Sequence, residues 1–226
     1  MTDKKKKQPN MIMLGLFMGV LGAISAGLLA GADILTKKPI KEAALKKTST
    51  ALKEVLPPFN NVPANEKIEI KATNGTKVVF YLAKMDNKIV GIAGEGYSNK
   101  GFNGNVTVML GLDPKGTIQK VIVTKQGETP GLGTVVTDRK REKTIFDLFS
   151  SKKKETGLPP NKILDGFDGH TVTPDGKKWA VKKDGGQFDF VTGATITSRA
   201  VTDAVYTVDS TFTANIAEIT GVPEKK

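Results

Sequence analysis

The feature that most constrains this chain is an uninterrupted apolar segment near its N-terminus. Residues Met11 to Ala32 carry no charged side chain. As an α-helix, this segment would extend about 33 Å, which matches the hydrocarbon thickness of a bilayer. The segment therefore predicts one membrane-spanning helix, with the remaining residues folding outside the membrane.

Two features bear on whether the segment is retained. Lys4 to Lys7 and Ala30-Gly31-Ala32 would suit the basic region and the cleavage site of a signal peptide, so cleavage is the alternative. The charge-free run is longer than the usual core of a signal peptide, which favours a retained anchor. Gly15 and Gly19 have the GxxxG spacing of closely packed membrane helices.

The flanking charges give a weak indication of orientation. Lysines lie on both sides of the segment, at positions 4–7 before it and within 37–41 after it, so the positive-inside rule is nearly balanced. We expect residues 1–10 in the cytosol and a single-pass anchor in the cell (inner) membrane over residues 11–32. The C-terminal domain would then lie on the extracytosolic side.

Residues 33–58 are predicted to form a juxtamembrane connector helix. Apolar residues recur there at roughly helical spacing among lysines, up to Pro57-Pro58, where the helix should end. The lysines could contact anionic lipid headgroups or simply face solvent, so membrane lipid is an expected partner. The apolar positions are Ile40, Ala43, Ala44, Leu45, Ala51, Leu52 and Val55.

Residues 59–226 read as a globular domain rich in strands and turns. Alternating segments joined by short Asn, Asp and Gly turns predict two antiparallel hairpins. The apolar spacing of Ser198 to Phe212 predicts an amphipathic helix that packs on the sheet, and Asp138 to Phe149 suits a shorter helix. The fold class is therefore α+β, a mostly antiparallel sheet domain with packed helices, preceded by one transmembrane helix. The predicted strands are residues 67–71, 77–83, 88–94, 106–112 and 117–124, with a further short strand at Trp179 to Val181.

Two residue counts restrict the chemistry. The chain has no cysteine, which excludes disulfides, zinc thiolate sites, iron–sulfur ligation and thiolate nucleophiles. His170 is the one histidine, so no site can use two, and we expect it to be an exposed loop residue. No catalytic residue and no metal site are predicted, and any redox chemistry needs a bound organic cofactor.

The net charge of +11 comes from 34 Lys and Arg residues against 23 Asp and Glu residues. Basic runs at positions 139–141, 152–154 and 177–178 lack interleaved aromatic residues. Together with the membrane anchor, this favours a solvated or docking surface, and no nucleic-acid partner is expected.

The segment Asp189 to Ser198 is the most informative in the chain. It places an apolar strand end, a Gly-Ala turn and four hydroxyl side chains just before the predicted helix. A helix N-terminus presents unpaired N–H groups that hold phosphate well, although Ser or Thr hydroxyls there can equally serve as helix caps. The alternation of Thr195, Ile196 and Thr197 predicts that both hydroxyls project to one side while Ile196 turns to the core.

A second segment, Gly127 to Gly133, follows the predicted strand at 117–124. Its three glycines and one proline specify a tight loop whose backbone can approach a planar ligand closely. Leu132 would offer an apolar contact to a ring.

Together, ETPGLG and the later D-x-x-T-G-A-T-x-T-S resemble the FMN-binding subunit shared by two ion-pumping respiratory complexes. These are the G subunit of the Rnf-type ion-translocating ferredoxin:NAD oxidoreductase complex and the C subunit of the sodium-translocating NADH:quinone oxidoreductase. The resemblance covers nearly the whole chain, including the N-terminal membrane helix and the glycine-rich segment Gly94 to Tyr97. The compact spacing is more similar to the Rnf-type subunit.

In that family, a flavin transferase joins FMN to the last threonine of the motif through a phosphoester. The matching residue here is Thr197, and Asp189 and Gly193 match positions that the transferase reads. Thr192 stands where serine is common, which keeps the hydroxyl. The resemblance implies that the cofactor-binding residues, besides Thr197, are Thr192, Gly193, Ala194, Thr195, Glu128, Thr129, Leu132 and Gly133.

The resemblance implies an electron-transfer subunit that is not catalytic on its own. It would relay electrons within a membrane complex that moves Na⁺ or H⁺, with the other membrane subunits and a flavin transferase as partners. The alternatives are the C subunit of the quinone reductase, a free-standing flavinylated extracytosolic electron carrier, and a non-redox anchored binding module.

Overall fold

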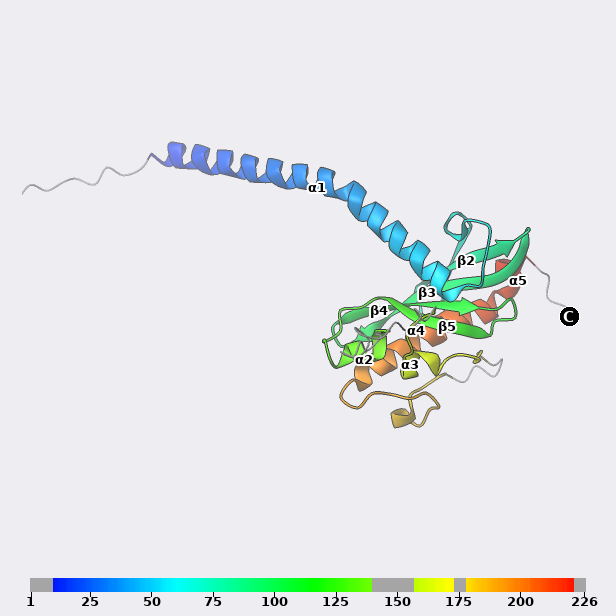
Figure 1. Cartoon of the computed structure of the whole chain (residues 1–226). Helices are drawn as coiled ribbons and strands as arrows, with labels where there is room; N and C mark the ends of the chain where they lie inside the picture. The colour runs from blue at the N-terminus through cyan, green and yellow to red at the C-terminus, as the bar shows by residue number, and fades with distance from the viewer. Residues whose placement is uncertain (1–9, 140–156, 173–177, 222–226) are drawn as a thin grey trace, which may run out of the picture. The chain divides into compact units, whose positions relative to one another are not determined.

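The computed structural model describes residues 10–139, 157–172 and 178–221. The chain divides into two units, residues 1–46 and residues 47–226. Helix α1 spans Met11–Val55 and belongs to the first unit up to residue 46 (Figure 1). Its apolar N-terminal part is exposed and is long enough to cross a membrane, and it is the one such candidate in the described ranges.

Helix α1 runs without interruption past the boundary expected between the membrane segment and the connector. That boundary was expected after Ala32, yet residues 33–55 continue the same helix, with Pro39 inside it. The helix ends at Val55, two residues before Pro57, because a residue that precedes proline disfavours the helical conformation. The predicted stop at Pro57-Pro58 therefore agrees with the structure.

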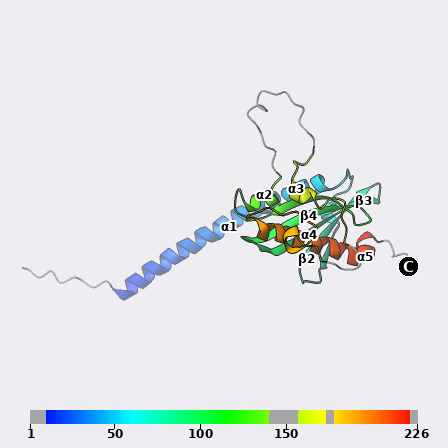
Figure 2. The ribbon, with the colours of Figure 1, turned by 90° about the horizontal axis from the view of Figure 1, so that it is seen from below.

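The second unit is built on a five-stranded antiparallel sheet with strand order β1-β2-β3-β4-β5. Figures 1 and 2 show this unit from two directions. Asp86 and Asn87 form the two-residue turn between β2 and β3, and both have positive φ angles, of 49° and 63°. This is the turn type that favours Asn and Asp, and it matches the twist of the strands. The α+β fold class is confirmed. The strands are β1 Lys67–Lys71, β2 Lys77–Met85, β3 Lys88–Gly101, β4 Gly104–Leu112 and β5 Ile118–Lys125.

Both faces of the sheet are covered by helix. On one face, side chains such as Phe80 pack against α4, Thr195–Ala214, where the Phe80 and Phe212 rings lie 5.9 Å apart. On the other face, Tyr81 belongs to a second apolar cluster that includes Leu52 from the end of α1. The strand period of two sends neighbouring residues to opposite faces, so the sheet has a core on each side.

Two glycines of β3 let α4 lie close to the sheet. A Cβ atom at Gly94 or Gly96 would lie 2.5 or 2.6 Å from a methyl group of Val208. Glycine is therefore required at both positions for this separation. The glycine-rich segment noted in the sequence is thus part of the strand on which α4 packs.

Three sequence expectations are corrected or lie outside the described residues. Trp179 to Val181 is not a strand: Val181 makes one isolated bridge to Phe188, and the Trp179 ring instead packs against Phe188 at 4.9 Å. The helix expected from Ser198 begins earlier, at Thr195. The helix expected from Asp138 falls outside the described residues from position 140 onward.

The remaining short elements are η1 Pro63–Asn65, α2 Gly133–Thr137, α3 Lys162–Asp165, η3 Lys182–Asp184 and α5 Ile216–Thr220.

Candidate functional site

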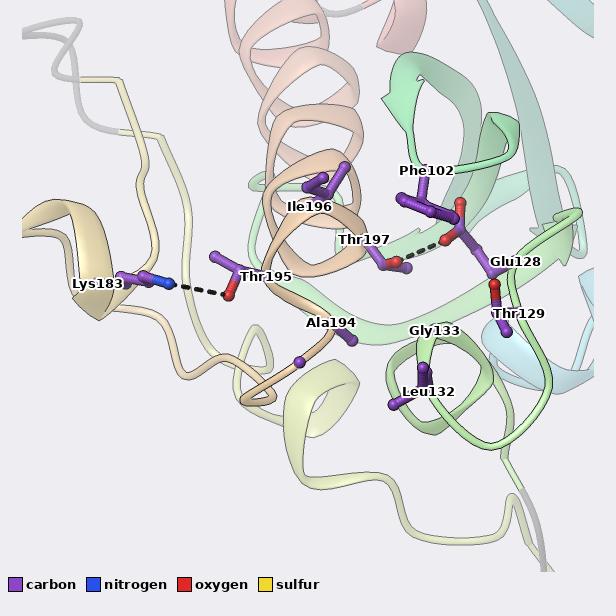
Figure 3. A pocket seen from close by; sticks show the side chains of 11 residues that line it. Phe102, Glu128, Thr129, Leu132, Gly133, Lys183, Ala194, Thr195, Ile196 and Thr197 are labelled. Carbon is purple, nitrogen blue, oxygen red and sulfur yellow. Dashed lines mark hydrogen bonds between the residues drawn. The ribbon is translucent and has the colours of Figure 1, made fainter.

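The two sequence motifs meet beside the first turn of α4. They border a pocket of about 320 Å³ that also receives one residue from the β3–β4 turn and one from η3 (Figure 3). Eight of the nine expected cofactor-binding residues line it, and the exception is Thr192, an exposed turn residue. The lining residues are Phe102, Glu128, Thr129, Leu132, Gly133, Lys183, Gly193, Ala194, Thr195, Ile196 and Thr197.

Thr197 and Glu128 form the central contact of this pocket. The Thr197 hydroxyl donates a hydrogen bond to Oε2 of Glu128 at 2.5 Å (Figure 3). Only 2% of Thr197 and 5% of Glu128 are exposed. Residues that are 69 positions apart in the sequence are therefore joined in a buried pair.

The first turn of α4 presents its side chains differently from the alternation that the sequence suggested. Ile196 is 46% exposed and lines the pocket, whereas Thr197 is buried against Glu128. The expectation was wrong because α4 already begins at Thr195, so successive side chains turn by about 100° and do not alternate.

The helix N-terminus is not capped by a hydroxyl, which was the alternative role for these side chains. The cap position is Ala194, and among the described residues no side chain makes a cap hydrogen bond there. Ser198 instead donates to the Ala194 carbonyl at 3.0 Å and accepts from the Val191 N–H at 3.2 Å. The N–H groups of the first turn thus remain suited to an anion.

Gly133 permits the close contact between the Gly127 to Gly133 loop and α4. A Cβ atom there would lie 2.6 Å from the Glu128 Cβ and 3.0 Å from the Thr197 hydroxyl oxygen. Any larger residue would separate the two motifs.

Large apolar side chains are exposed around the pocket. Phe102, Leu132 and Ile196 are 67%, 51% and 46% exposed. From Lys47 onward, the described chain has only two other exposed large apolar residues, Val62 and Val135. Such a concentration around one concave site is typical of a surface that a ligand or a partner protein covers. Phe102 was not among the expected site residues, although an aromatic residue at a hairpin tip was a signal that could have identified it.

A cation lies beside the α4 N-terminus, on the side opposite Glu128 (Figure 3). The Lys183 ammonium, carried by η3, donates to the Thr195 hydroxyl at 3.5 Å (Figure 3). Together with the uncapped helix end, it creates a positive environment for a phosphate group. Nothing in the local sequence around Lys183 distinguished it from the other lysines.

Asp189 does not line this pocket. Its carboxylate forms ion pairs with Lys182 at 2.5 Å and Lys162 at 3.5 Å, and the hydrogen bond from Lys182 lowers the pKa of Asp189 below its ordinary value. It borders a separate cavity of about 630 Å³. Asp189 therefore lies outside the contact shell of the candidate ligand pocket.

His170 is exposed, as expected, and it also does not line the pocket. Its ring lies 5.2 Å from that of Phe188 and 6.2 Å from that of Trp179. In the part of the chain that the structure describes, no group of His, Asp and Glu side chains could hold a metal ion.

Comparison with known proteins identifies the domain that carries this site. Residues 101–208 match the model of the FMN-binding domain family. The chain is 34% identical over 196 residues to a protein of Photorhabdus laumondii, and 36% identical over 197 residues to one of Salmonella typhi. It is 35% identical over 195 residues to a protein of Escherichia coli K12. Each alignment covers 84% of this chain and 85% of the relative, and all three relatives are named as the G subunit of an ion-translocating oxidoreductase complex. The chain belongs to this G-subunit family.

The pocket of this G-subunit family member fits the parts of FMN. The exposed apolar side chains of Phe102, Leu132 and Ile196 suit the faces of a flavin ring. Lys183 and the uncapped start of α4 suit the phosphate. The matched range 101–208 contains every residue that lines the pocket.

Proposed function

We propose that this chain is a membrane-anchored flavoprotein subunit that carries FMN covalently on Thr197. It relays electrons within an ion-translocating oxidoreductase complex of the Rnf type, in association with the other membrane subunits. Family membership and the FMN-binding domain support the cofactor and the complex. The observation that carries the attachment site is the Thr197 hydroxyl, which lines the pocket at an uncapped helix N-terminus.

Different residues bind the two ends of the cofactor, the flavin ring and the phosphate. Phe102, Leu132 and Ile196 exclude water from the ring, because they present apolar surface on the pocket wall. Lys183 and the N–H groups of α4 stabilise the phosphate. FMN, when bound, supplies one-electron and two-electron transfer.

Covalent attachment explains how a chain without cysteine can hold a flavin permanently. A phosphoester needs only a hydroxyl, and four hydroxyl side chains lie within residues 192–198. A flavin transferase would form the bond, and Asp189, outside the pocket, would belong to the surface that this enzyme reads. The subunit would not be catalytic by itself, because its role is to pass electrons between neighbouring carriers.

The attachment site is tested by coexpression with a flavin transferase. Thr197→Val keeps the β-branched shape and removes the hydroxyl, and Thr195→Val makes the same change two residues away. We expect Thr197→Val to lose all covalent flavin and Thr195→Val to keep at least part of it. In-gel flavin fluorescence after denaturation and peptide mass spectrometry measure the outcome. A flavin-bearing peptide in Thr197→Val, or loss of flavin only in Thr195→Val, would contradict the proposal.

A further inference from the structure

The Glu128–Thr197 pair places a carboxylate in a buried position, and packing alone does not explain this choice of residue. Both residues are buried, and within the described residues no Lys, Arg or His side chain pairs with the carboxylate of Glu128. Besides Thr197, its one other polar contact there is the Asn103 N–H, which donates to Oε1 at a long 3.4 Å. Burying a carboxylate without a cation is costly, and an apolar side chain would fill the space at lower cost.

The surrounding backbone is shaped to admit this carboxylate. A Cβ atom at Gly101 would lie 2.7 Å from Oε1, and one at Gly133 would lie 2.8 Å from Oε2. The backbone N–H of Glu128 also donates to Oε1 of Gln126 at 2.5 Å, which orients the residue. Two glycines and a local hydrogen bond thus hold the carboxylate against the Thr197 hydroxyl.

Formation of a phosphoester at Thr197 needs a base at this place. A threonine hydroxyl is a weak nucleophile until a neighbouring group accepts its proton. The flavin donor must carry a good leaving group, because FMN itself could only expel hydroxide. A flavin dinucleotide, in which FMN is joined to AMP through a pyrophosphate, meets this requirement.

We propose that Glu128 is the general base for attachment of the flavin to Thr197, a role that rests on the proposed covalent site. The Thr197 oxygen bonds to the phosphorus of the FMN half of FAD, while the pyrophosphate P–O bond breaks and AMP leaves. The Thr197 proton passes to Oε2 of Glu128 and from there to solvent. The reaction involves no change of oxidation state.

The same geometry explains why Thr197, and not its neighbours, accepts the flavin. The Thr195 hydroxyl faces the ammonium of Lys183, which cannot accept a proton. Ser198 donates a hydrogen bond to the backbone carbonyl of Ala194, which is too weakly basic to remove the proton. Thr197 is the hydroxyl of this first turn that is hydrogen-bonded to a carboxylate.

The test measures flavin transfer to the full-length chain in detergent, with purified flavin transferase and FAD. Glu128→Gln keeps the shape and removes the basicity. Its matched control is Glu95→Gln, because Glu95 also accepts hydrogen bonds from hydroxyl groups, those of Thr124 and Tyr81, but does not line the pocket. The readout is the single-turnover rate of covalent flavin fluorescence at saturating transferase, followed from pH 6 to pH 9.

We expect Glu128→Gln to slow the transfer by about 100-fold or more, with a rate that rises with pH as hydroxide replaces the base. Glu95→Gln should stay within about twofold of the unmodified chain. Glu128→Asp, which withdraws the carboxylate by one methylene, should be slowed about 10-fold without a change in the half-saturating transferase concentration. If Glu128→Gln does not fold, the transfer rate of Glu128→Asp decides the test.

A rate for Glu128→Gln within about threefold of the unmodified chain would overturn the proposal, since the transferase would then supply the base. So would an effect confined to the half-saturating transferase concentration, or an unchanged rate in Glu128→Asp. Failure of the proposed attachment site is a different result, and it is recognised by mass spectrometry of the flavin-bearing chain that carries no substitution. Flavin on a residue other than Thr197 would refute the attachment site itself.

Discussion

At the scale of single residues, a buried carboxyl on α4 links stability to pH. Oδ2 of Asp209 accepts the Val172 N–H at 2.6 Å, and Oδ1 has no hydrogen-bond partner among the described residues. Burial raises the pKa of Asp209 to about 7, from an ordinary value near 4 in the unfolded chain. The folded state therefore holds this proton more tightly than the unfolded state. The resulting stability is complete below about pH 4 and is lost as the pH rises through 7.

Asp209→Asn should remove most of this pH dependence, because an amide does not ionise. Between pH 4 and pH 8, we expect the free energy of unfolding of the variant to rise relative to the unmodified chain by on the order of 4 kcal/mol. Burial also raises the pKa of Asp168, to about 6, so a smaller slope should remain. Urea unfolding at several pH values measures the difference, and parallel pH profiles for the two proteins would contradict the assignment.

The side chain of Leu132 allows the placement of the flavin ring to be tested without disturbing the attachment. Leu132→Asp puts a charge on the pocket wall, and it should shift the flavin absorption spectrum or potential while covalent flavin is retained. Val135→Asp is the matched control, because Val135 is also 51% exposed but borders the other cavity. Equal spectra and equal electron-transfer rates for Leu132→Asp and the unmodified protein would argue against this placement.

At the scale of elements, the position of α4 on the sheet depends on the glycines of β3. Gly96→Ala would place its methyl group 2.6 Å from a Val208 methyl, so α4 must shift or Val208 must repack. We expect a loss of about 1–3 kcal/mol in the free energy of unfolding, which is typical of an overfilled core.

The double variant Gly96→Ala/Val208→Ala should be more stable than the sum of the two single changes predicts, because the smaller residue leaves room for the methyl group. Denaturant unfolding of the four proteins in this cycle measures the coupling. Strict additivity would show that β3 and α4 do not meet at these two residues.

At the scale of the whole molecule, the chain has two units, and its topology can be read by labelling. Because the protein has no native cysteine, Lys115→Cys in the exposed β4–β5 turn and Lys4→Cys before α1 give single-site reporters. The reagent is a membrane-impermeant maleimide, applied to cells whose outer membrane is permeabilised and whose inner membrane is intact. We expect labelling at position 115 only. Lysis should expose position 4, and the reverse pattern would show that the domain lies in the cytosol.

The sequence by itself indicated the five strands, the two long helices and the family motifs. The charge-free run from Met11, the alternation in β1 to β5 and the helical spacing of α4 are local patterns, and each follows from the period of one element. The glycine-rich loop and the threonine motif indicated the ligand class only through their joint resemblance to the FMN-binding family, because each alone also suits a turn or a helix cap. Eight of the nine expected contact residues do line one pocket.

Only the tertiary structure decided which groups meet. Where α4 begins depends on how its first turn docks, and this start buried Thr197 and turned Ile196 outward, against the strand-like alternation. Thr197 pairs with Glu128, and Phe102 and Lys183 line the same pocket. These residues come from segments that are far apart in the sequence. Local periodicity cannot encode such contacts, because they arise from close packing of the loop and α4, which glycines at 101 and 133 permit.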